Sequence, residues 1–250
     1  MYNCLILGSG RSGTSMLAGC LAKSGYFMGK DLHAPRDTNP KGFFEAPEIN
    51  SINESILSKA LPKRVPFIGN IISRNIPTNG QRWLARIPLK AKLSSDKNID
   101  QRIAKITSIT PFCFKDPRLS YTLPIWLPHL NNTRFLCVFR EPSITAKSII
   151  KECNTTKYLS NFHITHKNAL MVWMLMYQHI IEIHRHKGDW LFIHYDQILN
   201  GQAKNRIEIF LSARFDETFP DTRLKRTTSH IKPLCEEDKI YKNLCALANY

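Results

Sequence analysis

Short continuous runs of apolar residues alternate along this chain with segments in which apolar residues recur at helical spacing. The continuous runs lie at 3–7, 110–115, 133–139 and 189–195, and the periodic segments follow them, the longest at 166–186. Short apolar runs are typical of strands that are buried on both faces, and the longer periodic segments predict helices. The alternation predicts a three-layer α/β fold, with a mostly parallel central sheet and helices on both faces.

The first strand runs into a loop that carries three glycines, Gly8, Gly10 and Gly13, and a helical pattern begins directly after it. Glycine lets the backbone approach an anion closely, and the amino end of a helix adds about half a positive charge. We therefore predict that residues 8–15 bind a phosphate group.

Three kinds of phosphate loop compete for this stretch. The spacing Gly8-x-Gly10-x-x-Gly13 satisfies the dinucleotide fingerprint, but no second strong strand ending in an acidic residue follows about 20 residues on. A Walker A loop needs a lysine directly after Gly13, where this chain has Thr14. The cation here is Arg11, inside the loop. The missing strand disfavours a dehydrogenase, and the missing lysine disfavours a nucleoside triphosphatase.

The string Arg11-Ser12-Gly13-Thr14-Ser15 resembles the 5′-phosphosulfate loop of sulfotransferases that use 3′-phosphoadenosine 5′-phosphosulfate (PAPS). Protein-tyrosine and carbohydrate sulfotransferases have arginine at the position of Arg11, whereas cytosolic members have lysine. The resemblance implies a P-loop-like fold and a donor site in which five residues bind the 5′-phosphate: Gly10, Ser12, Gly13, Thr14 and Ser15.

A turn at Pro40 and Gly42 precedes two aromatic residues and Glu45, just before a helical pattern. Bacterial sulfotransferase-like proteins commonly show such an Asn-Pro-Lys-Gly-aromatic-aromatic-Glu run. The resemblance makes Glu45 a candidate general base for the acceptor hydroxyl. The alternative is a carboxylate that only favours the helix start through the macrodipole.

Charged residues follow the second and third predicted strands, at the edge of a parallel sheet where ligands bind. Lys115 begins a Lys-Asp-Pro string that resembles the same strand end in protein-tyrosine and bacterial sulfotransferases, which implies that it binds the sulfuryl oxygens and the leaving phosphate. We expect Asp116 and Arg118 to pair with each other as a structural contact.

Arg140 ends the third strand, and Ser148 follows eight positions later in the next helical pattern. This spacing resembles the pair that binds the 3′-phosphate in sulfotransferases, where a guanidinium binds phosphate bidentately and a hydroxyl adds a donor. The alternative is an ion pair of Arg140 with Glu141 or Glu152. Lys225 and Arg226 in the basic tail have a place comparable to the family's closing loop, which also contacts the 3′-phosphate.

Histidines gather around the long helical segment at 163–186, but they lack the carboxylate partners and fixed motif of a zinc helix. We interpret them as surface or core residues and expect no metal cofactor. The seven cysteines show no Cys-x-x-Cys pair, and several lie in apolar runs, so we expect buried free thiols in a reducing compartment.

The formal net charge of +15 over 250 residues favours anionic partners without choosing among nucleotide, sulfated glycan, nucleic acid and a membrane surface. Residues 59–105 hold eleven basic residues and two acidic ones, broken by prolines, and we interpret them as a basic substrate-side insertion in a single domain spanning 1–250. No recognised nucleic-acid motif, secretory signal or transmembrane segment is found. We expect a cytoplasmic protein, peripheral at a membrane surface at most.

These features predict transfer of a sulfuryl group from PAPS to an acceptor hydroxyl by in-line displacement, with Arg11 and Lys115 neutralising charge and Glu45 as the base. Carbohydrate or glycolipid acceptors are favoured, while peptide tyrosine and small alcohols stay open, as does the oligomeric state. Two other classes compete: a P-loop small-molecule kinase, which would lack its Walker lysine, and a non-catalytic module that binds a nucleotide or polyanion.

Overall fold

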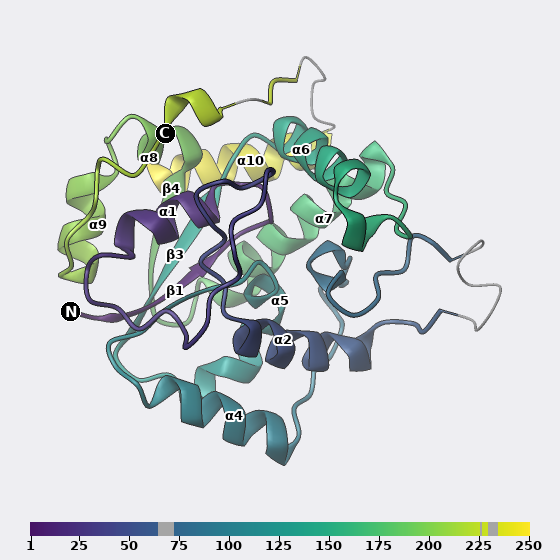
Figure 1. Cartoon of the computed structure of the whole chain (residues 1–250), viewed down its shortest axis with the longest axis horizontal. Coiled ribbons are helices and arrows are strands. Elements are labelled where there is room, and N and C mark those ends of the chain that lie inside the picture. The colour runs from purple at the N-terminus through teal and green to yellow at the C-terminus, as the bar shows by residue number, and fades with distance from the viewer. Residues whose placement is uncertain (65–72, 226, 230–234) are drawn as a thin grey trace.

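A four-stranded parallel sheet lies at the centre of the molecule (Figure 1). The computed structural model describes residues 1–64, 73–225, 227–229 and 235–250. The strands are β1 (Asn3–Leu7), β2 (Cys113–Lys115), β3 (Thr133–Phe139) and β4 (Asp189–His194), in the spatial order β2-β1-β3-β4. All three pairings are parallel, with Cys4 opposite Cys113 and Arg134. The predicted mostly parallel sheet is confirmed.

Alternation of side chains along the strands divides the core between two faces of the sheet. Leu5, Leu7 and Phe139 belong to one apolar cluster, which includes residues of α2 (Pro47–Ala60), α4 (Lys97–Thr107), α5 (Leu119–Trp126), α7 (His166–Gln178) and α10 (Cys235–Ala248). Cys4, Ile6 and Val138 face a second cluster, formed with α1 (Thr14–Leu21), α8 (Tyr195–Leu199) and α9 (Lys204–Leu211). The predicted three layers, with helices on both faces, are therefore confirmed.

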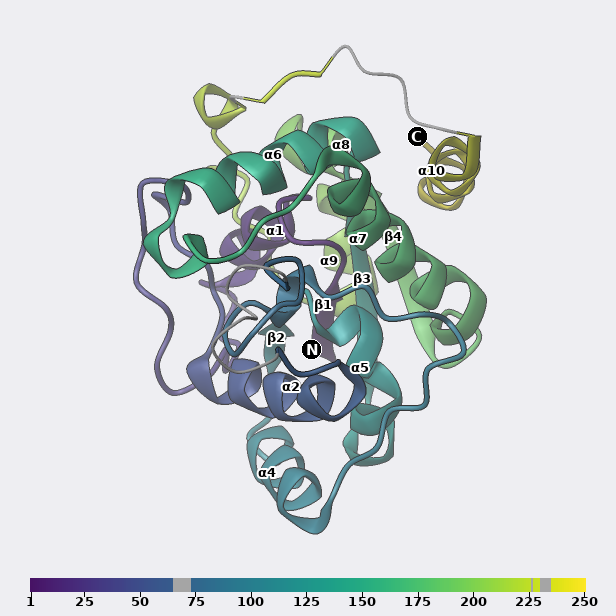
Figure 2. The ribbon, with the colours of Figure 1, turned by 90° about the vertical axis from the view of Figure 1, so that its right-hand side faces the viewer.

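A third apolar cluster joins α6 (Pro142–Thr155) to α7 and to residues 83–87. The short 3₁₀ turn η1 (Arg82–Leu84) supplies Trp83 and Leu84 to this cluster. Helices α2 and α6 lie on opposite sides of the loops that leave the strands (Figure 2). The remaining turns are 3₁₀ segments at Leu127–His129, Lys157–Leu159 and Thr222–Leu224.

The predicted helical segment at 166–186 consists of two parts, α7 and a π-helical continuation at His179–His184. His179 and His184 are buried, and each donates a hydrogen bond from Nε2 to a backbone carbonyl, that of Ile87 or of Ser120, at 3.0 Å. Their interpretation as core residues is confirmed. Burial lowers the pKa of His184 to about 4, so its imidazole is neutral at pH 7.

Five of the seven cysteines are buried free thiols, Cys4, Cys20, Cys113, Cys137 and Cys153, as the apolar runs predict. Burial raises the pKa of the Cys137 thiol well above its ordinary value. Across the described part of the chain, no helix has the length and apolar character needed to cross a membrane.

Candidate functional site

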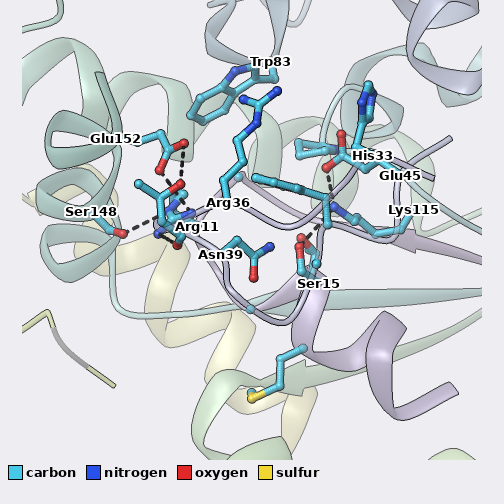
Figure 3. A pocket seen from close by; sticks show the side chains of 18 of the residues that line it. Arg11, Ser15, His33, Arg36, Asn39, Glu45, Trp83, Lys115, Ser148 and Glu152 are labelled. Atoms are coloured by element: carbon cyan, nitrogen blue, oxygen red, sulfur yellow. Dashed lines mark hydrogen bonds and ion pairs between the residues drawn. The ribbon is translucent and has the colours of Figure 1, made fainter. Parts of the chain in front are cut away.

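A cavity of about 870 Å³ opens at the carboxyl ends of the strands (Figure 3). Its floor is the glycine loop after β1, and Lys115 and Arg140 enter it from the ends of β2 and β3. The segment 33–45, helix α2, Trp83 and helix α6 form its walls. This is the edge of a parallel sheet at which α/β proteins bind their ligands.

The glycine loop can form only because two of its positions have no side chain. Gly8 and Gly13 have φ of +135° and +98°, and a Cβ on Gly8 would lie 2.2 Å from the carbonyl oxygen of Val138. A Cβ on Gly13 would lie 2.6 Å from the ring of Tyr195. The loop is fixed by hydrogen bonds of 3.1 Å from the Gly8 amide to Ser120 Oγ and from the Ser9 amide to the Tyr177 hydroxyl.

Helix α1 begins at Thr14 without a side-chain cap, and residues of its first turn line the cavity. The first amides of a helix have no intrahelical partner, so they are available to a ligand. Thr14, Ser15, Gly13 and Gly10 line the cavity, as the sequence predicts. Ser12 does not: its side chain is fully buried beneath the loop, and its amide donates to the Ser9 carbonyl at 3.2 Å. The loop therefore offers a phosphate-sized anion backbone donors and two hydroxyls, without Ser12.

Arg11 points toward helix α6. Its Nε donates to Ser148 Oγ at 3.2 Å, and its Nη1 lies 3.3 Å from the Glu152 carboxylate. Thr38 contacts both Arg11 and Glu152. Its carbonyl oxygen accepts from Arg11 Nη2, and its hydroxyl donates to the Glu152 carboxylate, both at 3.1 Å. Figure 3 shows this group on one side of the cavity and Lys115 on the other. The structure thus joins Arg11 to Ser148 rather than to Lys115.

Lys115 is only 1% exposed, and its ammonium forms an ion pair with Glu45 and donates to Ser15 Oγ at 3.2 Å. Glu45 is brought there by the turn that the sequence predicts, with Gly42 and Phe44 in the left-handed region at φ of +97° and +53°. Two of the three predicted catalytic residues, Lys115 and Glu45, are therefore in direct contact.

Asn50, one turn into α2, connects Glu45 to two residues that the sequence does not indicate for the site. Its Nδ2 donates to Glu45 at 3.2 Å and to Asp116 at 2.8 Å, and its Oδ1 lies 2.7 Å from His33 Nε2. Both carboxylates can only accept, so the amide nitrogen faces them and His33 must donate from Nε2. His33 Nδ1 is left as the basic atom of that ring.

Asp116 and Arg118 pair at 2.9 Å, which confirms the predicted structural contact. Arg118 also pairs with Glu54 at 2.7 Å, and both side chains are almost completely buried. Burial alone disfavours the charged guanidinium, but the Asp116 and Glu54 carboxylates raise the pKa of Arg118 above its ordinary value. This network fixes the turn after β2 and thereby the direction of Lys115.

Arg140 and Ser148 line the same cavity, as the predicted 3′-phosphate pair requires. Arg140 Nη2 donates to the Thr227 carbonyl at 3.1 Å, and its guanidinium lies 4.5 Å from the centre of the Tyr195 ring. The competing partners are engaged elsewhere, because Glu141 accepts from the first amides of α6 and Glu152 pairs with Arg11. No described carboxylate forms an ion pair with Arg140, and burial lowers the pKa of this guanidinium.

The contact of the basic tail with the 3′-phosphate stays a prediction. Lys225 Nζ lies 2.7 Å from the Asp196 carboxylate, and Lys225 is not among the described residues that line the cavity. Leu224 and Thr227 line it instead. Arg226 lies outside the described residues.

The sequence does not indicate His33, Thr38 and Asn50, which come from segments far from the strand ends along the chain. It offers Glu152 only as a partner of Arg140, although Glu152 stands one helical turn after Ser148 and so shares its face of α6. Across the described residues, no group of three or more histidine, cysteine or acidic side chains is placed to hold a metal ion.

Two solved structures resemble this chain over nearly its full length. A sulfotransferase domain from the curacin biosynthetic pathway has a TM-score of 0.55 and 15% identity, covering 97% of this chain and 97% of that one. A sulfotransferase domain from the Synechococcus PCC 7002 olefin synthase has a TM-score of 0.54 and 15% identity, covering 97% of this chain and 94% of that one. No family model and no curated protein sequence matches the chain. The P-loop-like α/β fold of sulfotransferase domains is thereby confirmed.

Proposed function

We propose that the protein is a sulfotransferase that transfers a sulfuryl group from PAPS to an acceptor hydroxyl. One observation carries the proposal: in a fold similar to that of sulfotransferase domains, one cavity holds an uncapped glycine loop, Lys115, and the Arg140 and Ser148 side chains. Each of these groups binds oxyanions, and together they provide two separate anionic subsites.

The donor side of the cavity would hold a nucleotide with a phosphate at the 5′ and another at the 3′ position of its ribose. The amides of the first turn of α1, with the Thr14 and Ser15 hydroxyls, would hold the 5′-phosphate. Arg140, which has no described carboxylate partner, would hold the 3′-phosphate with Ser148. PAPS supplies the sulfuryl group when bound.

The pairing of Lys115 with Glu45 suggests how the chain's own residues divide the chemistry. A phosphosulfate beside Ser15 would give the Lys115 ammonium a new anionic partner, which weakens its hold on the Glu45 carboxylate. Glu45 would then accept the proton of the acceptor hydroxyl as that oxygen bonds to sulfur. The bond between sulfur and the phosphate oxygen breaks on the opposite side, and Lys115 stabilises the charge left on that oxygen.

Arg11 would contribute fixed positive charge, since a guanidinium does not release its proton at neutral pH. To reach the phosphosulfate its guanidinium must leave Glu152, which is 3.3 Å away. The leaving phosphate departs as an anion and needs no proton, so a permanent cation suffices at this position. We propose a hydroxyl-bearing acceptor, with carbohydrate or glycolipid favoured.

A thermal-shift titration with adenosine 3′,5′-bisphosphate tests the donor site without knowledge of the acceptor. A ligand that binds only the folded chain raises the melting midpoint by mass action. We expect a shift with the bisphosphate that is larger than the shifts with ATP and NAD, and that is lost in Arg140→Ala. A selective shift with ATP and Mg²⁺ would support the kinase instead. Polyanion binding without any response to the bisphosphate would support the binding module.

A further inference from the structure

Arg36 is a cation of the cavity that the proposed donor site does not use. It belongs to the same segment as Glu45, and two hydrogen bonds with Asn39, of 3.3 and 2.7 Å, close the chain into a tight loop. Figure 3 shows its side chain rising from this loop between Arg11 and Trp83, into the cavity. The loop therefore presents a guanidinium to the cavity beside Trp83.

The charge of Arg36 is not balanced within the described residues. Arg11, Lys115 and Arg118 each have a carboxylate within 4.0 Å, whereas no described carboxylate lies within that distance of Arg36. Asp37 lines the same cavity without pairing with it. A cation directed into a cavity without a counter-ion is a site for an anionic ligand.

Two aromatic rings hold the Arg36 guanidinium in place. Its central carbon lies 5.4 Å from the centre of the Phe43 ring and 5.0 Å from that of Tyr158. Such contacts attract the cation but leave its N–H groups free to donate, since ring faces accept no conventional hydrogen bond. The arrangement orients a planar fork of donors and leaves it available to a carboxylate, sulfate or phosphate.

We propose that Arg36 binds an anionic group of the acceptor, so that the substrate is a hydroxyl compound that also carries a carboxylate, sulfate or phosphate. The inference rests on the proposed function, because it assigns Arg36 to the acceptor and not to the donor nucleotide. In the proposed function, Arg140 and the glycine loop already provide for the two phosphate positions of that nucleotide.

Direct binding measurements with matched probes test this assignment. We would use isothermal titration calorimetry with three pairs of probes, each an acidic compound and its neutral match. The pairs are 4-hydroxyphenylacetate and its amide, methyl glucuronide and methyl glucoside, and glycerol 3-phosphate and glycerol. Each probe is titrated with and without saturating adenosine 3′,5′-bisphosphate. At least one acidic probe should bind ~10-fold more tightly than its neutral match. Arg36→Gln should abolish that preference, and Arg36→Lys should keep part of it.

Arg214→Gln is the matched control, because Arg214 is exposed and is not a described lining residue of the cavity. It should leave the preference unchanged, and neither arginine variant should alter the melting midpoint or weaken bisphosphate binding. The inference is overturned if no acidic probe is preferred, or if Arg36→Gln keeps the preference. A tenfold or greater loss of bisphosphate affinity in Arg36→Gln would instead place Arg36 at the nucleotide.

The proposed function can fail separately. If the wild type does not bind the bisphosphate at all, the donor site is wrong, and the probe titrations without nucleotide still decide whether Arg36 recognises an anion.

Discussion

Two cations of the cavity, Arg11 and Lys115, are paired with carboxylates that an anionic ligand would have to replace. Arg11 pairs with Glu152, and Lys115 pairs with Glu45, whose side chain is 15% exposed. Buried ion pairs of this kind add little net stability, because the desolvation of both charges offsets their attraction. They do keep Arg11 and Lys115 oriented and balance the charges of these two residues. The same residues thus determine how firmly the site binds an anion and which carboxylate becomes free when it does.

Arg11→Ala should affect turnover more than nucleotide binding. The glycine loop and the Arg140 site stay intact in this variant, while a cation near the reacting group is lost, so we expect kcat to fall by ~10²-fold or more. The affinity for adenosine 3′,5′-bisphosphate should fall less. Calorimetry and steady-state kinetics measure the two effects, and Arg140→Ala should show the reverse pattern. If both variants changed binding alone, the assigned roles would be wrong.

Glu45→Gln tests the proposed base with little change in shape. A carboxylate can accept the proton of the acceptor hydroxyl and an amide cannot, so the rate of the variant should be lower by ~10²- to 10⁴-fold. Steady-state kinetics of both proteins over a range of pH measure the effect. A rate within a few-fold of wild type would remove Glu45 as the base and direct attention to His33, which lines the same cavity.

At the scale of elements, helix α6 matters most to the site because it carries Ser148 and Glu152 one turn apart. Pro142 stands in its first turn, and the Glu141 side chain caps it by accepting from the amides of Ser143 at 3.0 Å and Ile144 at 2.6 Å. The cap sets where the helix starts, and thus the depth at which Ser148 enters the cavity. The negative cap also complements the helix dipole.

Glu141→Ala should therefore loosen the start of α6 and weaken the 3′-phosphate site together. Loss of a helix cap costs about 1 kcal/mol of stability, and Glu141→Asp should recover part of it because the shorter carboxylate is a favoured cap. Chemical denaturation and bisphosphate titration of the three proteins measure the two effects. Unchanged bisphosphate affinity in a destabilised Glu141→Ala would show that the cap does not position Ser148.

The sequence predicts the elements that depend on local pattern and misses contacts that depend on how distant segments meet. The strands, the loop at 8–15 and the start of α6 at Pro142 follow from apolar runs, glycines and a proline. The second strand is shorter than its apolar run, because Phe112 forms only an isolated bridge, with Phe27. The pairing of Arg11 with Glu152 joins a loop to a helix far along the chain, and no local pattern encodes it.

Geometry also decides which residues of a predicted motif reach the cavity. Ser12 belongs to a motif whose other members line the cavity, but its own side chain is fully buried and does not line it. Lys225 belongs to a basic tail, and it pairs with Asp196 in α8. Motif membership indicates the neighbourhood of a residue, whereas the direction of a side chain follows from backbone dihedrals and packing.

At the scale of the whole molecule, stability in mild acid is limited by histidines that the core holds neutral. Burial lowers the pKa of both His184 and His194 from 6.5 to about 4. His194 Nδ1 accepts from the Asp196 amide at 3.2 Å, a contact that only the neutral ring can make. His184 Nε2 donates to the Ser120 carbonyl in either protonation state, so burial is what favours its neutral ring. Asp216 and Asp221, with their pKa lowered to about 2, lose their contacts only at more acidic pH.

Between pH 6.5 and 4 the unfolded chain binds a proton at each of these two histidines, whereas the folded chain does not. The free energy of unfolding should therefore fall as the pH falls through this window. The loss from pH 7 to pH 5 should be about 2 kcal/mol for each histidine. His184→Gln keeps the Nε2 donor and His194→Asn keeps the helix-capping acceptor, so each should reduce the slope of stability against pH. Denaturation series at several pH values measure it, with exposed His186→Asn as the control. If these variants and the control all have the wild-type slope, the acid sensitivity comes from other groups. The buried imidazoles then do not limit the stability of the fold in mild acid.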